Sequence, residues 1–125
     1  MKKILIGSGT KIKIQRGEII LVNFDPVRGS EQRGIRPAIV IQNDIHNKHS
    51  PTTIIAPITS RIYLKDYPTN VFISKEDSRL SKNSTILFNQ IKTIDKSRII
   101  KKISKLNPYL MFQVDLSIKV SLGLE

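Results

Sequence analysis

The sequence predicts a mainly β protein, arranged as a small, strongly bent sheet or barrel, with one α-helix at the C-terminal end. Short runs rich in Ile, Val and Phe are separated by turn signals over most of the chain. Only the last segment changes to the apolar period of a helix. With 125 residues the chain can build one hydrophobic core and is too short for two.

The strand-like runs are residues 18–24, 36–42, 53–58, 69–73 and 84–93. Pro, Gly, Asn and Asp punctuate the connectors between these runs, as turns require. The first connector, residues 25–35, is longer than the roughly 2–5 residues of a typical hairpin loop. Loops of this length in small domains are often lids or binding loops, so we expect this connector to carry function.

The predicted helix begins near Pro108 and ends before Gly123. Pro suits the first helical position, Asn107 can cap the first turn, and Gly suits the position after the last turn. The apolar stripe along this helix consists of Leu110, Met111, Val114, Ile118 and Leu122. We therefore expect these five side chains to face the core.

The composition indicates a polyanionic partner. Lys and Arg total 21 against 10 Asp and Glu, which gives a formal charge of +11. Nucleic acid ranks ahead of an anionic membrane, because the lysines do not follow one face of an amphipathic helix. The absence of cysteine excludes disulfides, thiolate nucleophiles and zinc–thiolate sites. No signal-peptide core or membrane span is visible, so we expect a cytoplasmic protein.

Residues 1–11 are basic and rich in small residues, and they lack an apolar pattern that would hold them to a core. We expect a flexible N-terminal extension there, followed by a single domain over residues 12–125. No internal repeat or linker divides the rest of the chain.

The sequence lacks the familiar motifs of hydrolases, NTPases and dehydrogenases. No Gly-x-Ser-x-Gly elbow, P-loop or dinucleotide-binding fingerprint occurs. The carboxylates are dispersed, without the spacing that gathers ligands around a metal ion, so we expect no metal cofactor. His46 and His49 could act as an acid or a base, but solvated loop histidines beside Lys48 are the simpler interpretation.

The remaining candidates for chemistry could handle a phosphate without a metal. Arg36 lies where a glycine-containing loop enters an apolar strand, and Thr59 follows another apolar strand. A guanidinium binds two phosphate oxygens and a hydroxyl adds a third donor, so together they can stabilise a pentacoordinate phosphorus. On spacing alone, a surface ion pair of Arg36 with Glu31 is an equally good interpretation. A role in a turn or cap is the better interpretation of Thr59.

RNA would supply its own nucleophile to such a site, because its 2′-hydroxyl can attack the adjacent 3′-phosphate. The protein would then align the attack, stabilise the oxyanion and supply a proton to the departing 5′-oxygen. The amides of Asn89 and Gln90 could contact base edges, although alternation along a half-exposed strand is the default explanation for them.

Several segments, in order over about residues 12–124, form one extended pattern. They are Arg16-Gly17-Glu18-Ile19, Pro26, Gly-Ser-Glu-Gln-x-Gly-x-Arg-Pro at 29–37, Ile41-Gln42-Asn43-Asp44, Asn47, Ser50-Pro51-Thr52, Ile58-Thr59, Pro68-Thr69, residues 89–98 and Ser121-Leu122-Gly123-Leu124. This pattern resembles the MazF/PemK family of toxin endoribonucleases. Asn89 departs from the acidic residue that is common at this position in close relatives.

The resemblance implies an SH3-like small β-barrel of the PemK/CcdB type, with a C-terminal helix, that forms a homodimer. It also implies sequence-specific, metal-independent cleavage of single-stranded RNA such as mRNA, leaving 2′,3′-cyclic phosphate and 5′-OH ends. Arg36 and Thr59 fall on the family's two catalytic positions. Ser30, Glu31 and Gln90 match positions near the family's RNA-binding groove, and Gln32 and Arg33 are further loop donors for RNA.

The resemblance further implies a partner, a MazE-like antitoxin whose acidic C-terminal segment occupies the groove of the toxin dimer. The charge of +11 suits such a partner. Two alternatives stay open. One is a non-catalytic CcdB-like toxin that binds a protein such as gyrase, and the other is a plain nucleic-acid-binding module.

Overall fold

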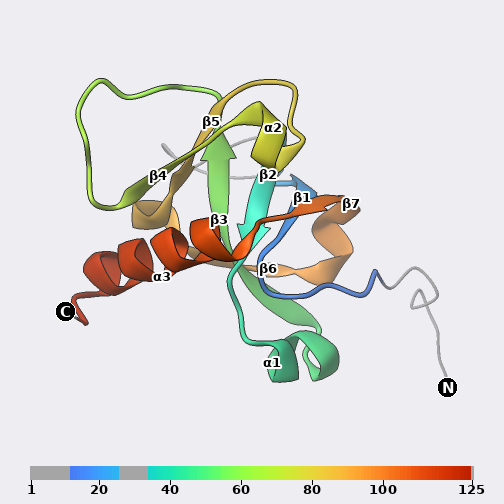
Figure 1. Cartoon of the computed structure of the whole chain (residues 1–125). Coiled ribbons are helices and arrows are strands. Elements are labelled where there is room, and N and C mark those ends of the chain that lie inside the picture. Colours follow the sequence, from blue (N-terminus) through green and yellow to red (C-terminus); the bar gives the residue numbers. More distant parts are fainter. Residues whose placement is uncertain (1–11, 26–33, 125) are drawn as a thin grey trace, which may run out of the picture.

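Seven antiparallel strands form one curled sheet, and a long C-terminal helix lies across it (Figure 1). The computed structural model describes residues 12–25 and 34–124. The strands are β1 (Glu18–Asn23), β2 (Ile35–Val40), β3 (Thr52–Thr59), β4 (Asn70–Ile73), β5 (Ser84–Leu87), β6 (Lys92–Asp95) and β7 (Ile99–Lys105). Their order in the sheet is β4-β5-β3-β2-β1-β7, and β6 pairs with the first half of β3.

The helical elements are α1 (Asp44–His49), α2 (Lys75–Ser78), η3 (Phe88–Gln90), η4 (Lys96–Arg98) and α3 (Pro108–Leu122), where η denotes a 3₁₀ helix. The predicted class, mainly β with a C-terminal helix and a small, barrel-like sheet, is therefore confirmed. The outer strands β4 and β7 do not pair with each other in the described part of the chain, so the curled sheet stays open.

Two strands differ from the sequence-based expectation. Residues 84–93 do not form one strand, because η3 interrupts them and separates β5 from β6. β7 is an additional strand, whose apolar alternation is obscured by Lys101, Lys102 and Lys105. Lysines suit this position because β7 is an edge strand, where charge discourages pairing with another chain.

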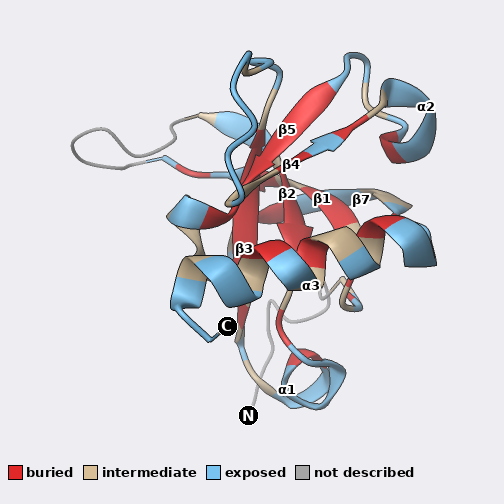
Figure 2. Cartoon of the chain, turned by 60° about the vertical axis from the view of Figure 1, so that its left-hand side comes forward, coloured by how far each residue is buried: buried red, intermediate tan, exposed pale blue. Residues whose placement is uncertain are grey.

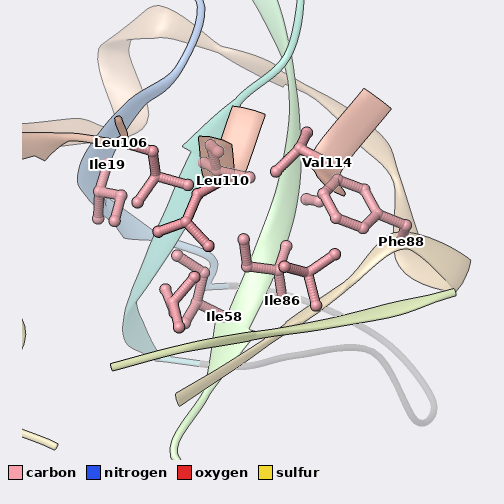
Figure 3. Packing of buried hydrophobic residues seen from close by; sticks show 11 residues of the cluster. Ile19, Ile58, Ile86, Phe88, Leu106, Leu110 and Val114 are labelled. Carbon is pink, nitrogen blue, oxygen red and sulfur yellow. The ribbon is translucent and has the colours of Figure 1, made fainter. Parts of the chain in front are cut away.

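Each face of the sheet has its own apolar cluster. The first cluster, between the sheet and α3, contains Ile19, Ile39, Ala56, Ile58, Val71, Ile73, Ile86, Phe88, Leu106, Leu110 and Val114 (Figure 3). The second cluster contains Ile14, Ile20, Val22, Phe24, Ala38, Val40, Ile55, Ile94 and Ile99. Strand alternation explains the division, since Ile39 of β2 belongs to the first cluster and its neighbours Ala38 and Val40 to the second. The central strands are therefore buried on both faces (Figure 2).

The ends of α3 follow the prediction. The side chain of Asn107 accepts a hydrogen bond from the backbone N–H of Leu110 at 2.9 Å, and Pro108 occupies the first turn. Gly123 ends the helix in the left-handed region at φ 72°, where a residue without Cβ is favoured. Within residues 12–25 and 34–124 no helix has both the length and the apolar character needed to cross a bilayer.

The predicted apolar stripe of α3 is confirmed for all its residues except the last. Leu110 and Val114 are buried, and Met111 and Ile118 pack against the first cluster. Leu122 is 58% exposed, so its assignment to the core is wrong. With 3.6 residues per turn, a repeat of four drifts by about 40° each time, so the stripe has turned by about 120° when it reaches Leu122.

α1 takes the place of the loop that the sequence analysis expected around His46 and His49. The side chain of Asn43 caps this helix by accepting a hydrogen bond from the backbone N–H of His46 at 2.9 Å. His46 and His49 are exposed, as expected of solvated histidines, although they lie on a helix. A capped helix of only six residues gives little apolar periodicity, which is why the sequence suggested a loop.

A buried polar network holds α1 against the sheet. The side-chain oxygen of Asn47 accepts hydrogen bonds from Gln42 Nε2 at 3.0 Å and from Thr53 Oγ1 at 2.8 Å, and all three residues are buried. Asp44 accepts a hydrogen bond from the backbone N–H of Arg16 at 2.7 Å, and this bond is the main cause that lowers the pKa of Asp44. Because the pKa is lower in the folded state, this contact stabilises the fold above about pH 4 and is lost on acidification.

Replacing Asn47 with Ala should lower the free energy of unfolding by about 2–3 kcal/mol, because the buried Gln42 and Thr53 lose their acceptor. Urea denaturation of the variant and the wild type measures the change. Lys48→Ala, on the exposed side of the same helix, is the matched control and should change stability by less than about 0.5 kcal/mol. Equal stability of the two variants would contradict the structural role of Asn47.

Candidate functional site

Arg36 in β2 and Thr59 in β3 lie on one face and at one end of two neighbouring strands. The register pairs Ala38 with Pro57, and side chains two residues away along a strand share its face. The strands are antiparallel, so the residues before Ala38 and those after Pro57 lie at the same end. This face carries the second cluster, and Arg36 and Thr59 lie beyond the last apolar residues of that cluster. We call this end of the two strands the rim. Arg36 is exposed and Thr59 is half-buried.

The ends of the predicted binding loop are held together next to this rim. The Phe24 N–H donates to the Gly34 carbonyl at 2.9 Å, and the Gly34 N–H donates to the Asp25 carboxylate at 3.0 Å. The guanidinium of Arg98 donates to the backbone carbonyls of Asn23, at 3.1 Å, and of Asp25. The predicted RNA-binding residues outside the described ranges are Ser30, Glu31, Gln32 and Arg33. Residues 23–25 and Gly34, which we call the stem, therefore fix the two described ends of that loop.

The hydroxyl of Thr59 is positioned by the turn after β3. Its Oγ1 accepts a hydrogen bond from the backbone N–H of Arg61 at 3.2 Å, which uses a lone pair and not the hydroxyl hydrogen. The carbonyl of Arg61 in turn accepts a hydrogen bond from Thr85 Oγ1 at 2.9 Å. Thr85 lies on β5, where it pairs with Thr59. The turn is thus held from two strands, and the hydroxyl keeps its capacity to donate.

Gln90 lies on the other side of β3 from Arg36. β3 pairs with β6 through its first half and with β5 at its end, and η3 lies between these two partners. The change of partner falls at Pro57, whose nitrogen has no hydrogen to donate to a ladder. Gln90 ends η3 and is half-buried. The structure therefore brings Arg36 and Thr59 to the rim of two paired strands and places Gln90 beyond β3.

Lys92 is a cation near this face that sequence reasoning did not assign to the site. Its Nζ lies 5.5 Å from the centroid of the Phe24 ring, a cation–π contact. Phe24 belongs to the second cluster and is 2% exposed, so the lysine covers an otherwise apolar part of that face. A signal in the sequence was the spacing, because Lys92 and the buried Ile94 are two residues apart and share one face of β6.

Two acidic side chains in the described part of the chain form ion pairs within the fold. Asp115 pairs with Arg16 at 2.7 Å, and Glu18 pairs with Lys102 at 3.3 Å. Within the described ranges no group of three or more His, Asp or Glu side chains could hold a metal ion.

The fold is a small, barrel-like antiparallel sheet with a C-terminal helix, and Arg36 and Thr59 lie at the rim. The model of PemK-like, MazF-like toxins of type II toxin–antitoxin systems matches residues 15–122, so the chain belongs to this family. The resemblance inferred from the sequence motifs is therefore confirmed.

Solved structures of family members have the same fold. MazF of Deinococcus radiodurans is 26% identical with a TM-score of 0.75, and the match covers 90% of this chain and 98% of that chain. A MazE–MazF structure from the same organism is 25% identical with a TM-score of 0.72, covering 91% and 99%. A mycobacterial endoribonuclease, in complex with its cognate antitoxin, is 19% identical with a TM-score of 0.75, covering 90% and 97%. The last likeness shows the fold alone.

Replacing Gly34 with Ala should lower the free energy of unfolding by about 1 kcal/mol, through backbone strain alone. Its φ is +73°, and an added Cβ would meet no described atom within 4 Å. Gly17→Ala is the matched variant and should cost more, because its φ is +94° and the Cβ would lie 3.2 Å from Met111 Sδ. Urea denaturation compares the two, and a larger loss at Gly34 would contradict this description of the stem.

Proposed function

We propose that the chain is an endoribonuclease toxin that cleaves single-stranded RNA at specific sequences without a metal ion. The observation that carries the proposal is the joint position of Arg36 and Thr59, a planar cation and a hydroxyl at one rim of paired strands. Membership of the MazF-like toxin family supports it, as does the formal charge of +11, which favours a polyanionic substrate.

The proposed reaction uses the nucleophile of the RNA itself. The 2′-oxygen forms a bond to the adjacent phosphorus, and the bond between that phosphorus and the 5′-oxygen breaks. The 2′-hydroxyl passes its proton to solvent water and the 5′-oxygen gains one, so no proton is consumed overall, and the products are a 2′,3′-cyclic phosphate and a 5′-hydroxyl. The pentacoordinate intermediate carries more negative charge on its oxygens than the diester, so donors that bind it more tightly lower the barrier.

Arg36 and Thr59 are the proposed catalytic residues. A guanidinium is a poor base because it keeps its proton at neutral pH, so Arg36 stabilises the phosphorane through its planar fork and donates a proton toward the departing oxygen. Thr59 adds a third donor, since the hydrogen bond from the Arg61 N–H engages only a lone pair of its hydroxyl. Contacts to the RNA strand are assigned to Ser30, Glu31, Gln32, Arg33 and Gln90.

The proposed protein partner is an antitoxin with an acidic C-terminal segment. Solved relatives support this assignment, because MazF of Deinococcus radiodurans has been solved with MazE and the mycobacterial endoribonuclease with its cognate antitoxin. The formal charge of +11 would steer an acidic segment toward the toxin, and such a segment competes with RNA for the same positive surface.

The exposed face of α3 supports the proposed homodimer. The large side chains along this face are Tyr109, Phe112, Leu116 and Val120, with exposed fractions of 70, 60, 43 and 44%. Phe72 of the edge strand β4 is 53% exposed beside them. The groove between α3 and β4 has a volume of about 510 Å³, and its lining contains only two charged residues, Asp66 and Asp77. Two strongly basic chains can therefore meet here without bringing lysines together.

Arg36→Ala should leave the fold intact and lower kcat about 100- to 1000-fold, since the loss of one transition-state donor has effects of this size. Arg36→Lys should retain only a part of the wild-type kcat, because an ammonium lacks the planar fork. Thr59→Val should also be slow, whereas Thr59→Ser should retain most activity. Cleavage of a mixed-sequence RNA in EDTA, followed by sequencing of the new 5′ ends, measures the rates and gives the preferred site.

A 2′-deoxy substitution at the scissile nucleotide controls for the proposed chemistry and should block cleavage completely. Continued cleavage of that substrate would exclude attack by the 2′-hydroxyl. Intact RNA with the wild-type protein, together with growth arrest, would instead support the alternative of a toxin that binds a protein target. Salt-sensitive binding without products would support a plain RNA-binding module.

Leu116→Lys should convert the dimer to a monomer, because it places a charge in the centre of the apolar face of α3. Sedimentation velocity at micromolar concentration measures the change. Ile100→Lys is the matched control, since Ile100 on β7 is 45% exposed and Leu116 is 43% exposed. A Leu116→Lys protein that remains as dimeric as the Ile100→Lys protein would rule out this face.

A further inference from the structure

The connection between β3 and β4 carries a cluster of three planar side chains. It leaves the end of β3, arches away from the sheet and returns to β4 beside α3 (Figure 1). The guanidinium carbon of Arg61 lies 4.6 Å from the centroid of the Tyr63 ring. The ring of Tyr67 meets that of Tyr63 edge-on, at an angle of 89° and a centroid distance of 5.9 Å. Arg61 and Tyr67 are exposed and Tyr63 is half-buried.

The backbone of Arg61 ties this cluster to the candidate catalytic site. Its N–H donates to Thr59 Oγ1 at 3.2 Å, and its carbonyl accepts from Thr85 Oγ1 at 2.9 Å. The planar side chains therefore begin two residues after Thr59, on a turn held by two paired strands. The position of the cluster relative to the rim is thus set by the sheet.

A guanidinium over an aromatic ring is a good surface for an unpaired base. Single-stranded RNA is bound largely by stacking of its splayed bases on aromatic rings and on arginine planes. Here the contact with Tyr63 and the edge-on Tyr67 already order the side chains, so less rotamer entropy is lost when a base stacks. The positive charge of Arg61 also favours the adjacent phosphate.

We propose that Arg61 and Tyr63 form a stacking subsite for an unpaired nucleobase of RNA, next to the phosphate that is cleaved. This inference rests on the proposed ribonuclease function and adds a substrate contact to it. Since every base has a flat face, the subsite increases affinity for the strand and not the choice of sequence. Substrates that end before this nucleotide lose the contact.

The test uses RNA that contains the cleavage site, with a 2′-deoxy scissile nucleotide and with 2-aminopurine on each flanking side in turn. The fluorescence of 2-aminopurine should be quenched at one of these positions when wild-type protein binds. Arg61→Ala and Tyr63→Leu should remove the quenching and weaken binding on the order of tenfold. Tyr63→Phe should retain both, because the ring is kept. Arg61→Lys should lose most of the quenching, because an ammonium has no plane.

Cleavage kinetics with the unmodified RNA separate this role from catalysis. Arg61→Ala should raise KM on the order of tenfold with kcat within about twofold, since the hydrogen bond to Thr59 comes from the backbone and survives the substitution. Lys101→Ala on β7 is the charge control and should keep wild-type quenching. Circular dichroism spectra verify that each variant is folded.

The possible outcomes distinguish the two proposals. In one outcome, the wild-type protein cleaves RNA while the Arg61→Ala and Tyr63→Leu variants bind RNA and quench the fluorescence as it does. This result would overturn the stacking subsite and leave the proposed ribonuclease function standing. If Arg61→Lys keeps full activity and quenching, the positive charge alone explains the contact, and the stacking subsite is also overturned. Variants that lose affinity only for an acidic antitoxin peptide would assign the cluster to that partner instead. Wild-type protein that neither cleaves nor binds RNA would overturn both proposals.

Discussion

The pairing of β2 with β3 is the constraint on which the candidate site depends. Ala38 lies opposite Pro57, and this register carries Arg36 and Thr59 to the same face and the same end of the sheet. A slip by one residue would turn one of these side chains toward α3. Both faces of the two strands are buried, so any slip would also break the packing of two clusters. The packing of the two clusters thereby positions the candidate catalytic residues.

The motif residues of the family fall into two physical groups. Arg36 and Thr59 lie at the rim, where a ligand can reach them. Gln42 and Asn47 are buried and hydrogen-bond to each other, and Thr53, which lies outside the motifs, donates to the same oxygen of Asn47. Membership of a motif therefore does not by itself separate residues that a ligand can reach from residues that hold the fold together. The distinction appears only from burial and partners, because the same amide can contact a base or hold a helix in place.

The charged and apolar surfaces of the chain suit different partners. The chain as a whole is strongly basic, but the groove between α3 and β4 is not. The lining of this groove is largely apolar, and its charged residues are acidic. The turn after β3 connects the two regions, since it begins at the rim with Arg61 and ends at Pro68, whose carbonyl accepts a hydrogen bond from Ser117 of α3.

The sequence alone determined the fold class, the ends of α3 and the family, since caps, apolar periods and ordered motifs are local signals. It did not reveal β7, whose lysines mask the alternation, or η3, whose place depends on the change of partners along β3. The juxtaposition of Arg36 with Thr59, and the attachment of Arg61 to both threonines, were decided only by tertiary structure. Strand register joins residues that are distant in the chain, and no local pattern encodes it.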